Sequence, residues 1–329
     1  MIWEKFFAAI GIATVFFILL GLLSTAYTFL HPSRLPKYLH DGKESYAFIT
    51  GATDGVGRSM AYELAKSGFN LVLHGRNSEK LYAITEDLNN QYPAIKTRHF
   101  VFDASKDLLE DSVLQDLYKV LQGIHLTILV NNVGGMGCLP PVNLFKAYES
   151  YEGDQIDTVL NVNIRFMTQL TRILLPLLDH GPISINSKKA KRQPSLILNM
   201  GSVAAHGSPY VSVYTGTKAF VASFSNSLSM EMQMEGKDIN VQVLILGEAR
   251  SGSHIVKEGF LIPNADTYAR SALKRVGSDR EAIISGYFPH WIAKTMVHIL
   301  PERVSRQIFI NAVKEKKEAH EKRMASLVE

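Results

Sequence analysis

Residues 46–73, YAFITGATDGVGRSMAYELAKSGFNLVL, decide the fold. The stretch begins with the apolar run 46–50, which is typical of a strand buried on both faces of a parallel sheet. A glycine-containing turn follows, then a helical pattern with apolar residues at 60, 64 and 65, and then a second apolar run at 70–73. This order of strand, turn, helix and strand predicts a βαβ unit.

The turn at 51–57 lies at the amino end of the predicted helix. Free N–H groups and the helix dipole favour a pyrophosphate there. Its spacing is G-x-x-x-G-x-G, which differs from the G-x-G-x-x-G of the general dinucleotide fingerprint. A plain strand-to-helix turn is the alternative. We predict that this turn binds a dinucleotide through Gly51, Thr53, Asp54, Gly55, Val56 and Gly57.

The residues after the second apolar run indicate which dinucleotide binds. A ribose-binding acid would be expected here for NAD, but the chain has His74-Gly75-Arg76-Asn77 and no acid before Glu79. A guanidinium suits a 2′-phosphate, so Arg76 favours NADPH. The alternative is that Arg76 is a solvated loop residue.

The alternation of strands and helices continues along the chain. We expect further strands at 97–102, 126–130, 195–200 and 241–246, and helices at 81–90, 108–121 and 154–178. This pattern predicts an α/β fold with a doubly wound parallel sheet of the Rossmann type, in which ligands bind at the carboxyl ends of the strands. Gly51, Asn131 and Ser202 all fall at such ends.

A third motif follows the strand at 195–200. Tyr214 and Lys218 stand at i and i+4, so they share one helix face. An ammonium beside a phenol stabilises the phenolate, and lowering the Tyr214 pKa by about three units would be worth roughly 4 kcal/mol. Ser202 stands where its hydroxyl could reach the carbonyl oxygen that Tyr214 protonates. Taken alone, this Tyr–Lys spacing also fits a solvated helix face.

The amino-terminal part of the sequence predicts a membrane anchor. The 25 residues 6–30 carry no charge, which is enough to span a bilayer, and Trp3 and Tyr27 stand near the two ends. A cleaved signal peptide is the competing interpretation. Arg34, Lys37 and Lys43 follow the segment, so the positive-inside rule places the rest of the chain in the cytosol. Residues 31–44 read as a linker.

The composition excludes several other classes of function. A net charge of +4 over 329 residues indicates no nucleic-acid partner. The single cysteine, Cys138, excludes an internal disulfide. The 11 histidines show no metal-ligand spacing and have no cysteine companions, so we expect no metal site.

Together these motifs resemble the short-chain dehydrogenase/reductase family from about residue 44 to the end. T-G-A-T-D-G-V-G at 50–57 looks like its cofactor turn, and N-N-V-G at 131–134 looks like its strand-four motif. Four residues match its catalytic tetrad: Asn163, Ser202, Tyr214 and Lys218. The anchor, L-I-L-N-M-G-S at 196–202 and G-Y-F-P-H at 286–290 most resemble the very-long-chain 3-oxoacyl-CoA reductase and 17β-hydroxysteroid dehydrogenase branch.

The resemblance implies a membrane-anchored, NADPH-dependent ketoreductase on the cytosolic face of the endoplasmic reticulum. The implied substrate is a lipid-like carbonyl, with 3-oxoacyl-CoA of fatty-acid elongation first and a steroid or specialised-metabolite ketone second. A scaffold of the same fold that binds a dinucleotide without catalysing is a further alternative. Elongation-complex partners and a homodimer are left open.

Residue roles also follow from the resemblance. Tyr214 would donate the proton, Ser202 would hydrogen-bond the oxyanion, Lys218 would also bind the nicotinamide ribose, and Asn163 would hold a water. The remaining implied cofactor contacts are Asp103, Asn131, Asn132, Gly134, Ala249 and Ser251. The implied domains are an anchor at 1–30, a linker at 31–44 and a reductase domain at 45–329, which ends in a substrate lid and helix at about 247–329.

The chain departs from the family pattern at three places. Ser202 precedes Tyr214 by 12 residues, one fewer than is usual in the family. The segment 246–253 replaces the usual Pro-Gly with Leu-Gly and carries two extra charges, Glu248 and Arg250. Residues 180–193 form a polar, basic insertion. In the lid region, 287–300 reads either as a core helix or as an amphipathic helix in the membrane interface.

Overall fold

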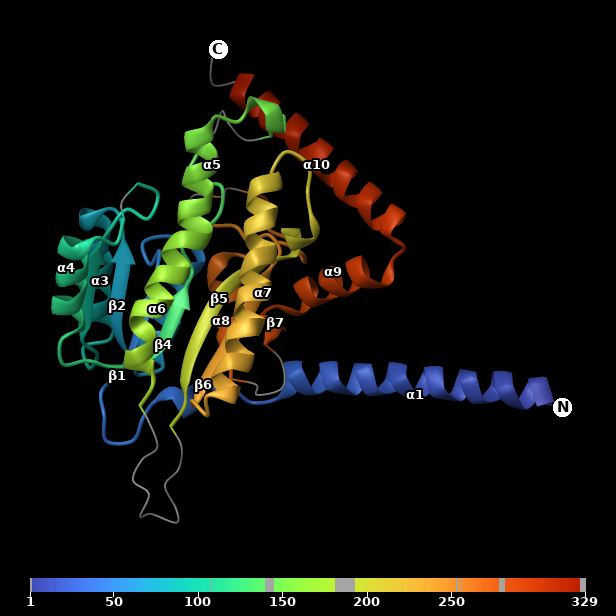
Figure 1. The fold of residues 1–329 in the computed structure, drawn as a ribbon, viewed down its shortest axis with the longest axis horizontal. Helices are drawn as coiled ribbons and strands as arrows, with labels where there is room; N and C mark the ends of the chain where they lie inside the picture. Colours follow the sequence, from blue (N-terminus) through green and yellow to red (C-terminus); the bar gives the residue numbers. More distant parts are fainter. Residues whose placement is uncertain are drawn as a thin grey trace.

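The computed structural model describes residues 2–106, 108–139, 145–180, 193–252, 254, 256–277 and 282–325. Its centre is a seven-stranded, all-parallel sheet in the order β3-β2-β1-β4-β5-β6-β7. Figure 1 shows this sheet between two layers of helices. The strands are β1 (Ser45–Ile49), β2 (Asn70–Gly75), β3 (Thr97–Val101), β4 (His125–Asn131), β5 (Ser195–Ser202), β6 (Ile239–Leu246) and β7 (Ile283–Ser285).

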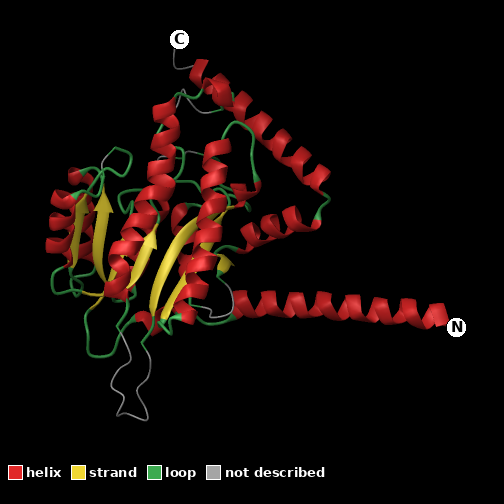
Figure 2. Cartoon of the chain, in the orientation of Figure 1, coloured by secondary structure: helices red, strands yellow, loops and turns green. Residues whose placement is uncertain are grey.

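Helices cover both faces of the sheet, as Figure 2 shows in outline. Helices α2 (Gly55–Lys66), α3 (Ser78–Gln91) and α8 (Ala265–Leu273) bury Met60, Leu81 and Tyr268 in one apolar cluster. Helices α4 (Asp111–Leu121), α6 (Phe166–Leu178) and α7 (Ser212–Met234) bury Leu117, Leu170 and Met232 in a second cluster on the other face. The predicted doubly wound α/β fold is therefore confirmed.

The strand order reverses between β1 and β4, which are direct neighbours. In such sheets the ligand crevice opens at the carboxyl ends of the strands on either side of this switch point. The glycine turn follows β1, and the segment 131–134 begins at the last residue of β4. The topology therefore brings these two segments, which are about eighty residues apart in the chain, to one place.

The region expected to be a substrate lid, 247–329, is partly core. Helix α8 buries Tyr268, Ala272 and Leu273, and β7 extends the sheet beside β6. A strand of three residues is too short to show a periodic pattern in the sequence. The rest of this region forms α9 (Phe288–Ile299) and α10 (Glu302–Ala325), which lie over the end of the domain (Figure 1).

The long helix expected at 154–178 is interrupted. It runs as α5 (Gly153–Leu160), a π turn, η4 (Asn161–Arg165), and then α6. The π turn carries Asn163, and π turns are often found at functional sites.

The amino-terminal segment forms one helix, α1 (Ile2–Leu30), which projects from the domain (Figure 1). Among the described residues it is the one helix long and apolar enough to cross a membrane, and its span is exposed. At its base, the rings of Phe29 and Phe288 lie 5.1 Å apart, and the Arg275 guanidinium lies 5.2 Å from the Phe29 ring. Helix α1 thus leaves the domain beside α9.

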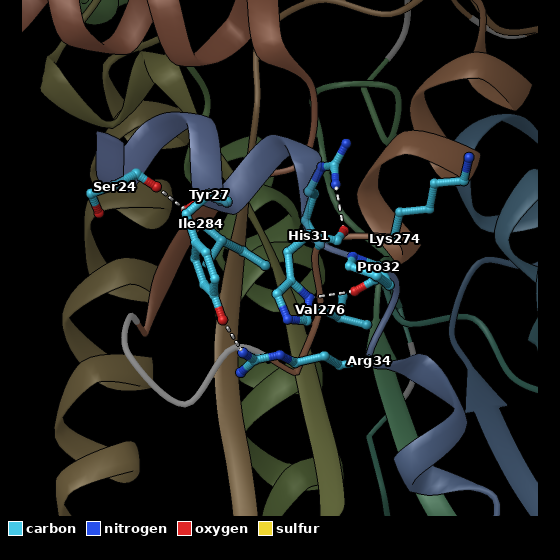
Figure 3. A pocket seen from close by; sticks show the side chains of 10 residues that line it. Ser24, Tyr27, His31, Pro32, Arg34, Lys274, Val276 and Ile284 are labelled. Carbon is cyan, nitrogen blue, oxygen red and sulfur yellow. Dashed lines mark hydrogen bonds between the residues drawn. The ribbon is translucent and has the colours of Figure 1, made fainter. Parts of the chain in front are cut away.

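The segment after α1 packs against the domain. It forms the short helix η1 (Leu35–Tyr38), whose Leu35 and Tyr38 are buried, and the Tyr38 hydroxyl lies 2.8 Å from Asn240 Oδ1. Figure 3 shows the junction, where Arg34 donates to the Tyr27 hydroxyl at 2.9 Å beside a cavity of about 30 Å³. Because of these contacts, the segment that we expected to be a linker packs against the domain.

Candidate active site

The glycine turn has the backbone that a phosphate-binding turn needs. Gly51 and Gly55 have φ angles of +66° and +55°, which favour glycine. A Cβ on Gly57 would lie 2.2 Å from the Gly51 carbonyl oxygen, so the close approach of helix α2 to the turn requires glycine there. Asp54 caps α2 by accepting the Gly55 N–H at 2.7 Å.

A cavity of about 470 Å³ opens in front of this turn, at the carboxyl ends of β1, β2 and β4. Seven of the expected cofactor residues line it: Gly51, Thr53, Asp54, Arg76, Asp103, Asn132 and Gly134. A neighbouring cavity of about 380 Å³ is lined by Asp54, Gly55 and Ser251. Ser251 packs over the turn, because a Cβ on Gly55 would lie 3.1 Å from the Ser251 Cβ. Asp54 lines both cavities, so they lie next to each other along the turn.

The side chains of two of the expected cofactor residues make contacts within the protein. Asn131 Nδ2 donates to Thr171 Oγ1 at 3.0 Å and to Asn199 Oδ1 at 2.8 Å, so Asn131 joins β4 to β5 and α6. Val56 packs against the apolar cluster under α2. These contacts help to fix the end of β4 and the turn before α2.

His74 is a residue of this site that the sequence reasoning missed. Its Nδ1 accepts the Gly51 N–H at 3.3 Å, and its Nε2 lies 3.1 Å from the Phe102 carbonyl oxygen. Burial lowers the pKa of His74 to about 4, so the ring is neutral at pH 7. It joins the ends of β2 and β3 to the glycine turn. The position of His74 directly before Gly75-Arg76 was the sequence signal that could have indicated its place in this site.

Asn163 and Lys218 meet next to Gly134. A Cβ on Gly134 would lie 2.9 Å from Asn163 Oδ1 and 3.0 Å from Lys218 Nζ. Asn163 also accepts the Gly135 N–H at 2.8 Å and donates to the Gly135 carbonyl at 3.1 Å. The π turn is thereby tied to the loop after β4. Lys218 and Asn163 are both buried.

Ser202 and Tyr214 also come together, despite the shortened spacing between them. Ser202 ends β5, its Oγ accepts the Ala204 N–H at 3.1 Å, and its side chain hydrogen-bonds that of Tyr214. Helix η5 (Val203–His206) and the start of α7 carry the chain between the two residues. The structure therefore gathers all four expected catalytic residues at one edge of the sheet, beside the larger cavity.

The family model described as short chain dehydrogenase matches residues 45–256. The chain belongs to this family. It is 33% identical to the very-long-chain 3-oxoacyl-CoA reductase of Neurospora crassa, over 86% of this chain and 79% of the relative. It is 30% identical to a very-long-chain 3-oxoacyl-CoA reductase-like protein of Arabidopsis thaliana, over 88% of this chain and 86% of the relative.

Solved structures show the same fold. A 7β-hydroxysteroid dehydrogenase superposes with a TM-score of 0.63 at 18% identity, covering 81% of this chain and 97% of that chain. A short-chain dehydrogenase from Sphingobium yanoikuyae, solved with NADPH, gives 0.59 at 23% identity, covering 77% and 93%. The chain is an oxidoreductase of the short-chain dehydrogenase family.

One electrostatic expectation for this dehydrogenase is wrong in the structure. We expected Lys218 to lower the pKa of Tyr214, but burial raises that pKa and the Ser202 hydrogen bond opposes the rise. The Lys218 ammonium donates instead to the Met200 carbonyl at 2.9 Å and lies 5.7 Å from the centre of the Tyr214 ring. Burial lowers the pKa of Lys218 itself to about 8.

The extra charges after β6 are paired with residues of the carboxyl-terminal region. Glu248 accepts from His254 at 2.9 Å and from Lys316 at 2.6 Å, and Arg250 donates to Glu258 at 2.8 Å. The hydrogen bond from His254, with that from Lys316, lowers the pKa of Glu248 to about 2. Because Lys316 belongs to α10, this pair holds α10 to the segment after β6. Ser253 and most of the basic insertion at 180–193 lie outside the described residues.

Proposed function

We propose that this short-chain dehydrogenase is an NADPH-dependent ketoreductase that converts 3-oxoacyl-CoA to 3-hydroxyacyl-CoA in fatty-acid elongation. The observation that carries the proposal is a chain of contacts at one site. Asn163 and Lys218 meet at Gly134, which lines the cavity of about 470 Å³; Lys218 lies 5.7 Å from the Tyr214 ring, and Tyr214 hydrogen-bonds Ser202. The names of the relatives from Neurospora crassa and Arabidopsis thaliana support the acyl-CoA substrate.

NADPH, when bound, supplies the hydride. The chain's own residues supply the rest. Tyr214, with its raised pKa, keeps its proton at neutral pH and donates it to the carbonyl oxygen. Ser202 hydrogen-bonds the same oxygen as negative charge develops, a preorganised contact typically worth a few kcal/mol. Lys218 uses one N–H on Met200 and has two more donors for the cofactor ribose.

A groove next to this site suits an acyl chain. It measures about 680 Å³ and lies between the loop 206–209, which follows Ser202, and helices α9 and α10. Its apolar lining includes Val297, Leu300, Phe309 and Ile310, and Arg306 stands at its side. Glu302 lines the groove too and pairs with Arg306 at 3.6 Å. The apolar walls suit a long acyl chain.

The test is NADPH oxidation by the full chain in detergent, with a panel of long-chain 3-oxoacyl-CoAs, steroid ketones and small ketones. We expect turnover of the long-chain 3-oxoacyl-CoAs with the highest kcat/KM in the panel. Preference for a steroid or a small ketone would replace the substrate that we propose. Tight NADPH binding without turnover of any ketone would favour the non-catalytic scaffold.

Arg76 is proposed to select NADPH over NADH. It is exposed just after β2 and lines the cavity of about 470 Å³ together with Lys80, which lies in the first turn of α3. We expect Arg76→Ala to weaken NADPH binding by about 10-fold or more, since a hydrogen bond to a charged group contributes roughly 1.5–3 kcal/mol. NADH, which lacks the 2′-phosphate, is the internal control and should bind nearly as before. Equal losses for the two cofactors, measured by fluorescence titration, would show that Arg76 does not contact the phosphate.

We also propose that α1 anchors the enzyme in the endoplasmic reticulum membrane with the domain in the cytosol. Its exposed span of mean hydropathy 2.7 and the basic residues that follow it support this orientation. The start of α9 contacts the end of α1 at Phe29, so α9 lies on the membrane side of the domain. The full chain should stay with membranes after carbonate extraction, and its recovery in the soluble fraction would contradict the anchor.

A further inference from the structure

Three histidines from distant parts of the sequence meet at the amino edge of the sheet. His40 follows η1, His125 begins β4, and His180 follows α6. One ring nitrogen from each lies within 4.8 Å of the other two, and His40 Nδ1 and His125 Nε2 are 2.7 Å apart. His40 is buried, and the other two are partly buried. We call these three residues the histidine cluster.

The backbone holds two of these rings in one tautomer. His40 Nε2 lies 3.1 Å from the Pro194 carbonyl oxygen, and His180 Nε2 lies 2.9 Å from the Leu126 carbonyl oxygen. A carbonyl oxygen only accepts, so each Nε2 carries the proton and each neutral ring keeps a lone pair on Nδ1. A metal-bound histidine is usually fixed in this way, with its other nitrogen donating to a carbonyl or carboxylate.

We propose that the histidine cluster binds one divalent first-row transition-metal ion, with Zn²⁺ the favoured ion. Three imidazoles without a thiolate suit zinc, copper or nickel, and a three-histidine zinc site completes its coordination with water. With Zn–N bonds of about 2.0–2.1 Å, two ligand nitrogens of a tetrahedral site lie roughly 3.4 Å apart. To reach that value, the 2.7 Å contact between His40 Nδ1 and His125 Nε2 opens and the wider contacts close. The proton that His125 Nε2 donates to His40 Nδ1 moves to His125 Nδ1 at the same time, so that Nε2 has a lone pair for the metal.

Three carboxylates lie near the cluster and favour a bound cation: Asp41 and Asp238 near His40, and Asp179 near His180. The Lys43 ammonium lies near the three rings and opposes a bound cation.

The position of the cluster indicates a structural role for the ion. His125 and Asn131 are the two ends of β4, which puts the cluster roughly 20 Å from the catalytic edge at about 3.3 Å per residue. The three ligands belong to the segment after the anchor helix, the central strand β4 and the end of α6. A bound ion would therefore fasten the membrane-proximal segment to the centre of the sheet, without contact with the reacting groups.

The test uses the full chain in detergent, purified with a tag that contains no histidine, stripped with a chelator and desalted. After Zn²⁺ is added and excess is removed, we expect about one zinc per chain by elemental mass spectrometry and a higher Tm than for the stripped protein. Co²⁺ in place of Zn²⁺ should give the visible absorption of a tetrahedral site. His125→Gln and His180→Gln should each weaken zinc binding by more than the roughly 10–100-fold that follows loss of an outer contact.

His99→Gln is the matched control, because His99 lies on β3, where its ring contacts Tyr82, outside the cluster. It should keep the zinc. All three variants should have the wild-type kcat when they are assayed at a temperature well below their Tm. If His125→Gln folds poorly, His180→Gln still tests the site, because His180 is only partly buried and lies just after a helix end. Wild-type protein without retained zinc and without the cobalt absorption would overturn the proposal. So would equal zinc content in all four proteins.

Discussion

Replacing Tyr214 with phenylalanine is expected to lower turnover of the ketone at least 100-fold, because general acid–base catalysis typically contributes about 10²–10⁴. The substitution keeps the ring, which packs near the Lys218 ammonium, and removes only the hydroxyl that bonds Ser202. NADPH binding and Tm should therefore change little. Single-turnover NADPH oxidation, with cofactor affinity measured in parallel, gives the comparison.

Tyr82→Phe is the matched control, since Tyr82 is exposed on α3 and contacts His99. It should leave turnover unchanged. A Tyr214→Phe enzyme that retained near wild-type rates would remove Tyr214 from the proposed mechanism and would favour another proton donor. Loss of NADPH binding together with turnover would mean that the hydroxyl serves the cofactor site.

Lys218→Met is expected to abolish turnover and yet leave the protein as stable as the wild type at pH 7, or more stable. The ammonium is buried, and a fall of its pKa from 10.5 to about 8 costs the folded state roughly 3 kcal/mol of the unfolding free energy at neutral pH. Methionine removes that cost and fills a similar volume. The substitution also removes the hydrogen bond to the Met200 carbonyl, and this loss offsets about 1–3 kcal/mol of the gain in unfolding free energy.

The sign of the pH dependence makes this prediction specific. The folded-state pKa of Lys218 lies below its unfolded value, so the unfolded chain binds the extra proton between pH 8 and 10.5. The wild type is therefore penalised fully below about pH 8, and the penalty fades as the pH rises toward 10.5. The Tm advantage of Lys218→Met over wild type should shrink between pH 7 and pH 10. Lys66→Met, on the exposed end of α2, is the control and should show no such trend. A Tm difference independent of pH would contradict the buried charge.

Local pattern was enough to predict the fold class and much of the proposed site. The βαβ unit at 46–73 could be recognised because strand, turn and helix signals all depend on near neighbours in the chain. The spacing of Tyr214 and Lys218 placed both on one helix face for the same reason. A parallel sheet then brings the carboxyl ends of its strands to one edge, so the sequence predicts Gly51, Asn131 and Ser202 there.

Tertiary structure alone decided which atoms these side chains touch. Asn131 turns into the core toward Thr171, and the Lys218 ammonium donates to the Met200 carbonyl rather than lowering the pKa of Tyr214. Strand β7 has three residues and is stabilised by pairing with β6, so it carried no periodic signal of its own. His40, His125 and His180 are 85 and 55 residues apart along the chain, and no spacing rule could join them. Local sequence determined the elements and the edge where ligands bind, whereas long-range packing decided the contacts, because burial and hydrogen-bond partners depend on residues far away in the chain.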